Sequence, residues 1–150
     1  MSDTTFTIED IERLLPHRLP MRLVEGIVRV DDDSIETAAV ARETWPTANG
    51  GWVRSLLLVE FLAQSAAVLQ GWKERNEKAP GIGGLLVGIP AARPSQPKVP
   101  VGTVLVCSVR ISHGAPNYRA FDGEVKDAAG VLLLTGSIQA YRPDQPGEWI

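Results

Sequence analysis

The chain has 150 residues, a formal net charge of -3, one cysteine and two histidines. This length fits one domain with its own core, and the weak acidity excludes a general nucleic-acid binder, which carries a basic face. One cysteine excludes an internal disulfide, and so few histidines make a zinc site improbable. The apolar runs are too short to span a bilayer, and residues 1–5 lack the features of a signal peptide, so we expect a soluble, cytosolic protein.

The first part of the chain has the pattern of a helix followed by a hairpin. Residues 7–16 predict a short helix, in which Thr7 is a suitable N-cap and Asp10 stands where a capping box needs an acid. Two strand-like runs follow at residues 21–30 and 34–42, and three consecutive aspartates form the turn between them.

A long apolar helix is predicted in the middle of the chain. Residues 43–51 are rich in turn formers and predict a loop, and residues 52–75 predict the helix. A proline-rich connector spans residues 90–100, and an irregular tail begins at about residue 142. The remaining strands are predicted at residues 82–89, 103–112, 117–126 and 131–141. One long helix among six strands indicates an α+β fold in which an antiparallel sheet wraps around the helix.

One charged residue interrupts the apolar helix. Residues 56–69 are apolar on nearly every side at helical spacing, apart from Glu60. A carboxylate enclosed there loses its water, so it needs a partner or a proton. Gln64 lies one turn later on the same face, where its amide can orient the carboxyl group. Glu60 is therefore the first candidate for a functional residue.

Four short motifs occur in a recognisable order along the chain. They are Leu15-Pro16-His17-Arg18, Glu60-Phe61-Leu62-Ala63-Gln64, Val87-Gly88-Ile89 with Ala92-Arg93, and Pro100-Val101-Gly102-Thr103. Together they resemble the motifs of the 3-hydroxyacyl-acyl-carrier-protein dehydratases, which have the hot-dog fold. The last motif departs from the family by an inserted valine and by a threonine in place of an acid. The resemblance implies a homodimer whose sheets join edge to edge around an acyl tunnel, and it implies no cofactor and no metal.

The resemblance also implies roles for the helix residues. In the family a helix glutamate and a histidine of the partner subunit act on a 3-hydroxyacyl thioester, so Glu60 would be the acid/base and Gln64 its orienting partner. Backbone N–H groups at the start of the helix, around Ser55, Leu56 and Leu57, would polarise the thioester carbonyl.

The chain departs from the family at the catalytic histidine. Counted back from Glu60, that position falls at or near Pro46, and residues 44–49 contain no histidine. A water held near Asn49 is one candidate for the missing base, although Asn49 also suits a left-handed turn beside two glycines. His17 is the other candidate, although a histidine between prolines often only bonds to the backbone.

Three further residues have competing interpretations. Arg93 and Lys98 in the connector would contact the acidic surface of an acyl carrier protein or a phosphate of coenzyme A, or would be solvated loop residues. Cys107 alternates within a predicted strand, which indicates a small buried hydrophobe rather than a nucleophile.

Three functions follow from these residues. The leading hypothesis is a dehydratase of acyl-carrier-protein thioesters in fatty-acid or polyene lipid synthesis, since Met21 after the histidine motif resembles relatives from polyene pathways. The second is an acyl thioesterase, in which a helix carboxylate activates water. The third is a non-catalytic acyl-binding protein or partner subunit of an active dehydratase, which the missing histidine favours and the Glu60–Gln64 pair opposes.

Overall fold

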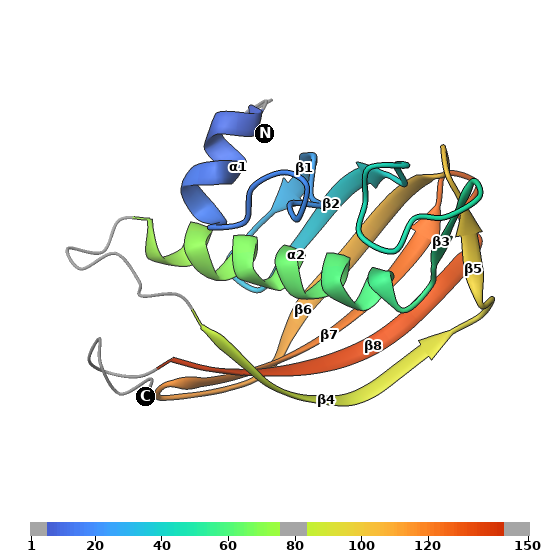
Figure 1. Ribbon diagram of the computed structural model, residues 1–150. Coiled ribbons are helices and arrows are strands. Elements are labelled where there is room, and N and C mark those ends of the chain that lie inside the picture. Colours follow the sequence, from blue (N-terminus) through green and yellow to red (C-terminus); the bar gives the residue numbers. More distant parts are fainter. Residues whose placement is uncertain (1–5, 76–83, 143–150) are drawn as a thin grey trace.

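The computed structural model describes residues 6–75 and 84–142. A six-stranded antiparallel sheet curves around one long helix, α2 (Leu57–Glu74), while the short helix α1 (Ile8–Leu14) packs beside α2 and the sheet edge (Figure 1). The strand order is β1-β2-β6-β7-β8-β4, and β3 and β5 form a separate pair. The strands are β1 (Gly26–Val30), β2 (Ser34–Val40), β3 (Trp52–Arg54), β4 (Leu85–Pro94), β5 (Lys98–Pro100), β6 (Val104–Ala115), β7 (Tyr118–Asp127) and β8 (Leu132–Tyr141).

Local capping starts α1 where the sequence predicts it. The side chain of Thr7 accepts a hydrogen bond from the Asp10 N–H, and the Asp10 carboxylate accepts one from the Thr7 N–H at 2.8 Å. This reciprocal pair is the predicted capping box. The helix ends at Leu14, two residues before the expected end, and the next residue is extended.

The core forms where α2 lies across the concave face of the sheet. Phe61, Leu62 and Leu69 of the helix are all 0% exposed. Close approach requires glycine opposite Leu62, because a Cβ on Gly123 would lie 2.9 Å from the Cδ1 atom of that leucine. Among the described helices, none is long and apolar enough to cross a membrane.

The predicted start of the long helix at residue 52 is wrong. Residues 52–54 instead form β3, in which Val53 is buried against Val99 of β5 and its neighbours are exposed. This alternation has the period of a strand rather than of a helix. Gly50 and Gly51 take the left-handed conformation (φ 61° and 84°), which makes the tight turn into β3.

Two other boundaries differ from the prediction by five residues, and the rest differ by less. The first strand begins at Gly26 rather than at residue 21, because residues 19–21 form a turn and residues 22–25 are irregular. The expected connector is largely strand, since β4 reaches Pro94, and its irregular register between Gly88 and Ala91 accommodates Pro90 on an edge strand. The start of the expected strand at 82–83 and the tail from 143 lie outside the described residues.

The packing of α1 on α2 predicts the effect of one substitution. A Cβ on Gly71 would lie 2.7 Å from the carbonyl oxygen of Leu14. The close atom belongs to the backbone and cannot move cheaply, so overpacking should cost about 2–3 kcal/mol here. The gain in helix propensity is about 1 kcal/mol, so we expect Gly71→Ala to lower the free energy of unfolding by about 1–2 kcal/mol. Urea denaturation measures this value. Gly114→Ala is the control, since its added Cβ meets no atom within 4 Å. A Gly71→Ala protein as stable as wild type would show that the helices are not in close contact.

Candidate active site

Gln64 connects the central helix to the segment that precedes the sheet. Its side chain is 1% exposed, and its carbonyl oxygen accepts a hydrogen bond from the Leu23 N–H at 2.8 Å. Its amide nitrogen donates to the Met21 carbonyl at 2.7 Å and to Oε1 of Glu60 at 2.9 Å. Because one end of the amide must accept and the other must donate twice, these partners fix its orientation. The Glu60 carboxylate is thereby held in one position.

His17 lies beside the same carboxylate. Its Nε2 atom is 3.4 Å from Oε1 of Glu60, and the two side chains are 35% and 34% exposed. The ring's other nitrogen, Nδ1, is buried and has no hydrogen-bond partner among the described residues, so Nε2 is the nitrogen that a substrate can reach. The Arg18 guanidinium holds this segment by donating to the carbonyls of Leu15 and Glu12 at 2.7 and 3.0 Å. One chain therefore places an imidazole, a carboxylate and its orienting amide together.

The expectation that protein encloses Glu60 is wrong for this chain. Its carboxylate faces a groove between α2, α1 and the strands rather than the core. Ala63 and Ala67 follow Glu60 along the same face of the helix, and their small side chains leave this face open. The carboxylate consequently keeps part of its water and is accessible to a ligand.

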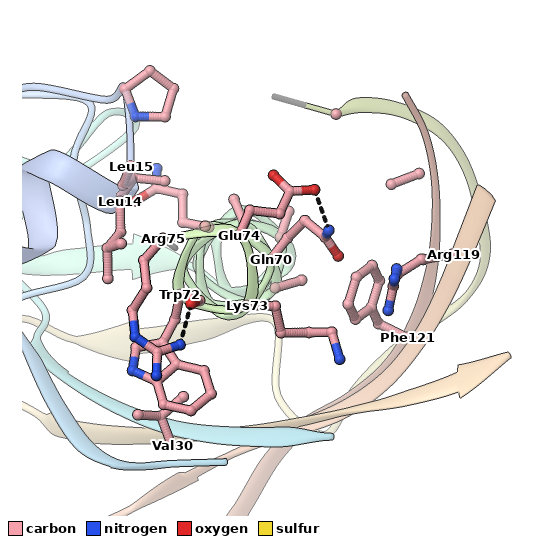
Figure 2. Close-up of a pocket in the computed structure, with 18 of the residues that line it drawn as sticks. Leu14, Leu15, Val30, Gln70, Trp72, Lys73, Glu74, Arg75, Arg119 and Phe121 are labelled. Carbon is pink, nitrogen blue, oxygen red and sulfur yellow. Dashed lines mark hydrogen bonds between the residues drawn. The ribbon is translucent and has the colours of Figure 1, made fainter. Parts of the chain in front are cut away.

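The groove continues along α2 toward its C-terminal end. Its far end contains Gln70, which lies roughly 15 Å along the helix from Glu60 and donates to the Glu74 carboxylate at 2.6 Å. Figure 2 shows these two side chains on the helix, with Arg119 and Phe121 across the groove from them. The lining includes small helix residues and apolar strand side chains, among them Phe121, Ile138 and Ala140, together with charged side chains such as Arg29 and Lys73. This shape suits an extended acyl chain with its reactive end at Glu60.

The first turn of α2 supplies only part of the predicted carbonyl site. The Ser55 N–H donates to the Pro97 carbonyl at 3.1 Å and is not available to a ligand. Within the described residues, the N–H groups of Leu56 and Leu57 have no acceptor. These two donors at the positive end of the helix remain available to a developing oxyanion.

Asn49 and Arg93 lie away from the groove. Asn49 pairs with Trp52 through two backbone hydrogen bonds of 2.9 and 3.1 Å, and the left-handed residues of that turn are the two glycines rather than Asn49. Arg93 is exposed on β4, opposite Thr135 of β8. Neither residue lines the groove around Glu60, so their substrate-binding roles stay predictions.

The cysteine is buried, as the sequence predicts. Cys107 is 0% exposed on β6, and burial raises the pKa of its thiol to about 12. The reactive form is the thiolate, so this group is not a nucleophile at neutral pH.

Sequence comparisons relate the chain to dehydratases. A sequence model of one family, described as ApeP-like (ApeP dehydratase), matches residues 9–150. The 3-hydroxyacyl-[acyl-carrier-protein] dehydratase FabZ of Streptococcus uberis is 39% identical over 75 residues. That alignment covers 47% of this chain and 54% of the relative, so the chain spans about half the length of the curated relatives that it matches.

Structural comparisons support the hot-dog fold predicted from the sequence. The dehydratase heterocomplex ApeI:P from Xenorhabdus doucetiae contains a chain that is 27% identical, with a TM-score of 0.80 and coverage of 90% of this chain and 91% of that chain. A hypothetical thioesterase with coenzyme A from Streptococcus pneumoniae is 13% identical, with a TM-score of 0.62 and coverage of 80% and 86%. The predicted hot-dog architecture is thus confirmed, and the second likeness concerns the fold alone.

The contacts of Gln64 predict a large stability effect. Gln64→Leu would leave the Leu23 N–H and the Met21 carbonyl without their partners. We expect the free energy of unfolding to fall by about 2–3 kcal/mol in urea denaturation, because buried unpaired groups pay their desolvation cost. Gln70→Leu, which removes one side-chain bond to Glu74, is the control and should cost about 1 kcal/mol or less. Equal decreases in the free energy of unfolding would show that the hydrogen bonds of Gln64 stabilise the fold no more than the single bond of Gln70 does.

The buried thiol predicts slow chemical labelling. A thiol reagent at pH 8 should modify Cys107 far more slowly in the native protein than in denaturing urea. Burial raises the pKa of this thiol from the ordinary value of 9.0 to about 12. Below pH 9 the thiol is protonated in both the folded and the unfolded chain, so it does not change the free energy of unfolding. As the pH rises from 9 toward 12, only the unfolded chain loses the proton, and the free energy of unfolding falls. Fast native labelling would contradict the burial.

Proposed function

Since the chain belongs to the ApeP-like dehydratase family, we propose that it binds a 3-hydroxyacyl thioester and removes water from it. The observation that carries this proposal is the 3.4 Å approach of His17 Nε2 to Glu60 Oε1 in one chain, beside a groove suited to an acyl chain. The similarity to FabZ over half of its length supports the same reaction class. A thioester of an acyl carrier protein or of coenzyme A is the proposed substrate.

The two side chains would divide the proton transfers between them. His17 takes the proton from C2 of the substrate, and the C2 electron pair forms the C2–C3 double bond as the C3–O bond breaks. Glu60 in its protonated form gives its proton to the departing hydroxyl, which leaves as water. The proton on His17 then returns to the carboxylate across their contact, so the pair ends as it began.

Two further parts of the site would assist this reaction. The N–H groups of Leu56 and Leu57 would donate to the thioester oxygen and stabilise the negative charge that develops when C2 loses its proton. Gln64 would keep the carboxylate aimed at C3, because its amide bonds Glu60 and two backbone groups at once. It is a positioning residue and does not touch the substrate.

A second candidate function is that of a partner subunit in a dehydratase complex. Counted back from Glu60, the position of the family's histidine falls at or near Pro46, where the chain has no histidine. The similar Xenorhabdus chain comes from a heterocomplex. The edge strand β4 also exposes four large apolar side chains, which an adjoining sheet would cover. They are Leu85, Leu86, Val87 and Ile89, with exposed fractions of 46–55%. We propose β4 as the edge that joins a second chain, whether an identical copy or a related dehydratase.

An assay of single substitutions tests the dehydratase proposal. The protein is incubated with a 3-hydroxyacyl thioester, and double-bond formation is followed by absorbance. Glu60→Gln and His17→Asn should each lower kcat by roughly 100-fold or more, as expected for loss of a general acid or base. Glu124→Gln and His113→Asn are matched controls, because Glu124 is half-buried and His113 exposed on strands outside the groove, and they should leave the rate unchanged.

The same incubation separates the alternatives. Release of free thiol without a double bond would replace the dehydratase by a thioesterase. Binding of the thioester without either product would favour the partner subunit, provided that the mixture with a FabZ-type dehydratase forms a complex. An active His17→Asn variant would show that the base lies elsewhere.

A further inference from the structure

The segment that carries His17 has no regular secondary structure of its own. It joins α1 to β1 and consists of irregular residues and one turn. Gln64 holds the later part of this segment through Met21 and Leu23. Proton transfer needs heavy atoms within about 3 Å of each other, so a reacting side chain in such a segment has to be held firmly. The contacts nearest to His17 therefore decide whether its imidazole stays beside Glu60.

A buried ion pair ties this segment to α1. Arg22 is the one buried arginine among the described residues, with 8% exposure, and its Nη1 atom donates to Oε2 of Glu12 at 2.8 Å. Within residues 6–75 and 84–142, no second carboxylate pairs with this guanidinium, and its Nε atom has no hydrogen-bond partner. A guanidinium cannot lose its proton in a protein, so the buried charge depends on this single carboxylate.

Glu12 also contacts Arg18, the residue next to His17. Oε2 of Glu12 lies 3.6 Å from Nε of Arg18, and the Glu12 carbonyl accepts a hydrogen bond from Nη2 of Arg18 at 3.0 Å. The same guanidinium donates to the carbonyls of Leu15 and His17 at 2.7 and 3.0 Å. One residue of α1 thus binds two arginines, which lie on either side of the turn at residues 19–21.

We propose that Glu12 is a positioning residue for His17. Its carboxylate holds Arg22 and Arg18, and these two arginines hold the backbone on both sides of the turn. The imidazole thereby stays 3.4 Å from the carboxylate of Glu60. Glu12 acts through the arginines and transfers no proton itself. The catalytic role of His17 rests on the proposed function, whereas its placement beside Glu60 does not.

The NMR signals of the histidine rings test this placement without any substrate. The chain has two histidines, and His113 on β6 lies outside the groove and serves as an internal reference. Glu60→Gln should shift the ring nitrogen and proton signals of His17, because it removes a carboxylate 3.4 Å away. In a Glu12→Gln background the same substitution should shift them by about half or less, since the interaction of a charge falls with distance.

A second substitution on α1 is the matched control. Glu9 is exposed on the same helix, and among the described residues it forms no ion pair. Glu9→Gln removes the same charge and should leave the effect of Glu60→Gln on the His17 signals at its full size.

A double-mutant cycle tests the same role in catalysis. Glu12→Gln should lower kcat for dehydration by roughly tenfold, because misplacing a reacting group by about 1 Å can cost about 100-fold. In a His17→Asn background it should lower kcat no further, since the residue through which Glu12 acts is gone. A residue that only stabilises the fold would lower kcat by the same factor in both backgrounds.

A paired substitution guards against loss of folding. Glu12→Gln with Arg22→Met leaves no buried charge without a partner, so this variant should fold and show the same weakened response of the His17 signals. A full response in both Glu12 variants would overturn the proposal, as would His17 signals that ignore Glu60→Gln in otherwise wild-type protein. Equal decreases in kcat in the two backgrounds would overturn it as well. If the wild-type protein dehydrates no thioester, the proposed function fails and the ring signals still decide the placement.

Discussion

One buried amide determines how the two halves of the site meet. Gln64 accepts from the Leu23 N–H and donates to both the Met21 carbonyl and Glu60, so the segment before β1 and the central helix share one set of hydrogen bonds. Leu23 is 0% exposed, so its N–H has no alternative partner in water, which makes the arrangement costly to break. The consequence for chemistry is that His17, a few residues earlier in this segment, stands 3.4 Å from the carboxylate on the helix.

Other features of the structure lie where a long ligand would extend from the His17–Glu60 pair. Small side chains on α2 leave a groove on one side, and the free N–H groups of Leu56 and Leu57 lie at the start of the helix. In the proposed function, the groove, the His17–Glu60 pair and these two N–H donors would hold the acyl chain, the reactive carbons and the thioester carbonyl in that order.

The sequence predicts the parts that depend on local spacing. The capping box of α1, the long apolar helix and the Glu60–Gln64 pair at i and i+4 all follow from residues a few positions apart. It does not predict the exposure of Glu60, because burial depends on which helix face the sheet leaves open. The His17 contact joins residues 43 positions apart in sequence and depends on turns that no pattern specifies. The apolar pattern predicts Arg54 in the helix, although the glycine pair before the alternating Trp52-Val53-Arg54 indicates a turn and a strand.

The central claim is that His17 and Glu60 of one chain flank the reacting carbons of a 3-hydroxyacyl thioester. The most direct measurement is a crystal structure of the protein with a 3-hydroxyacyl pantetheine amide, which cannot be cleaved like a thioester. We expect the substrate hydroxyl to lie within about 3 Å of the Glu60 carboxylate and C2 to face Nε2 of His17 from the same chain. A complex with the acyl head in the groove but C2 against a residue of a second chain, and His17 turned away, would contradict it.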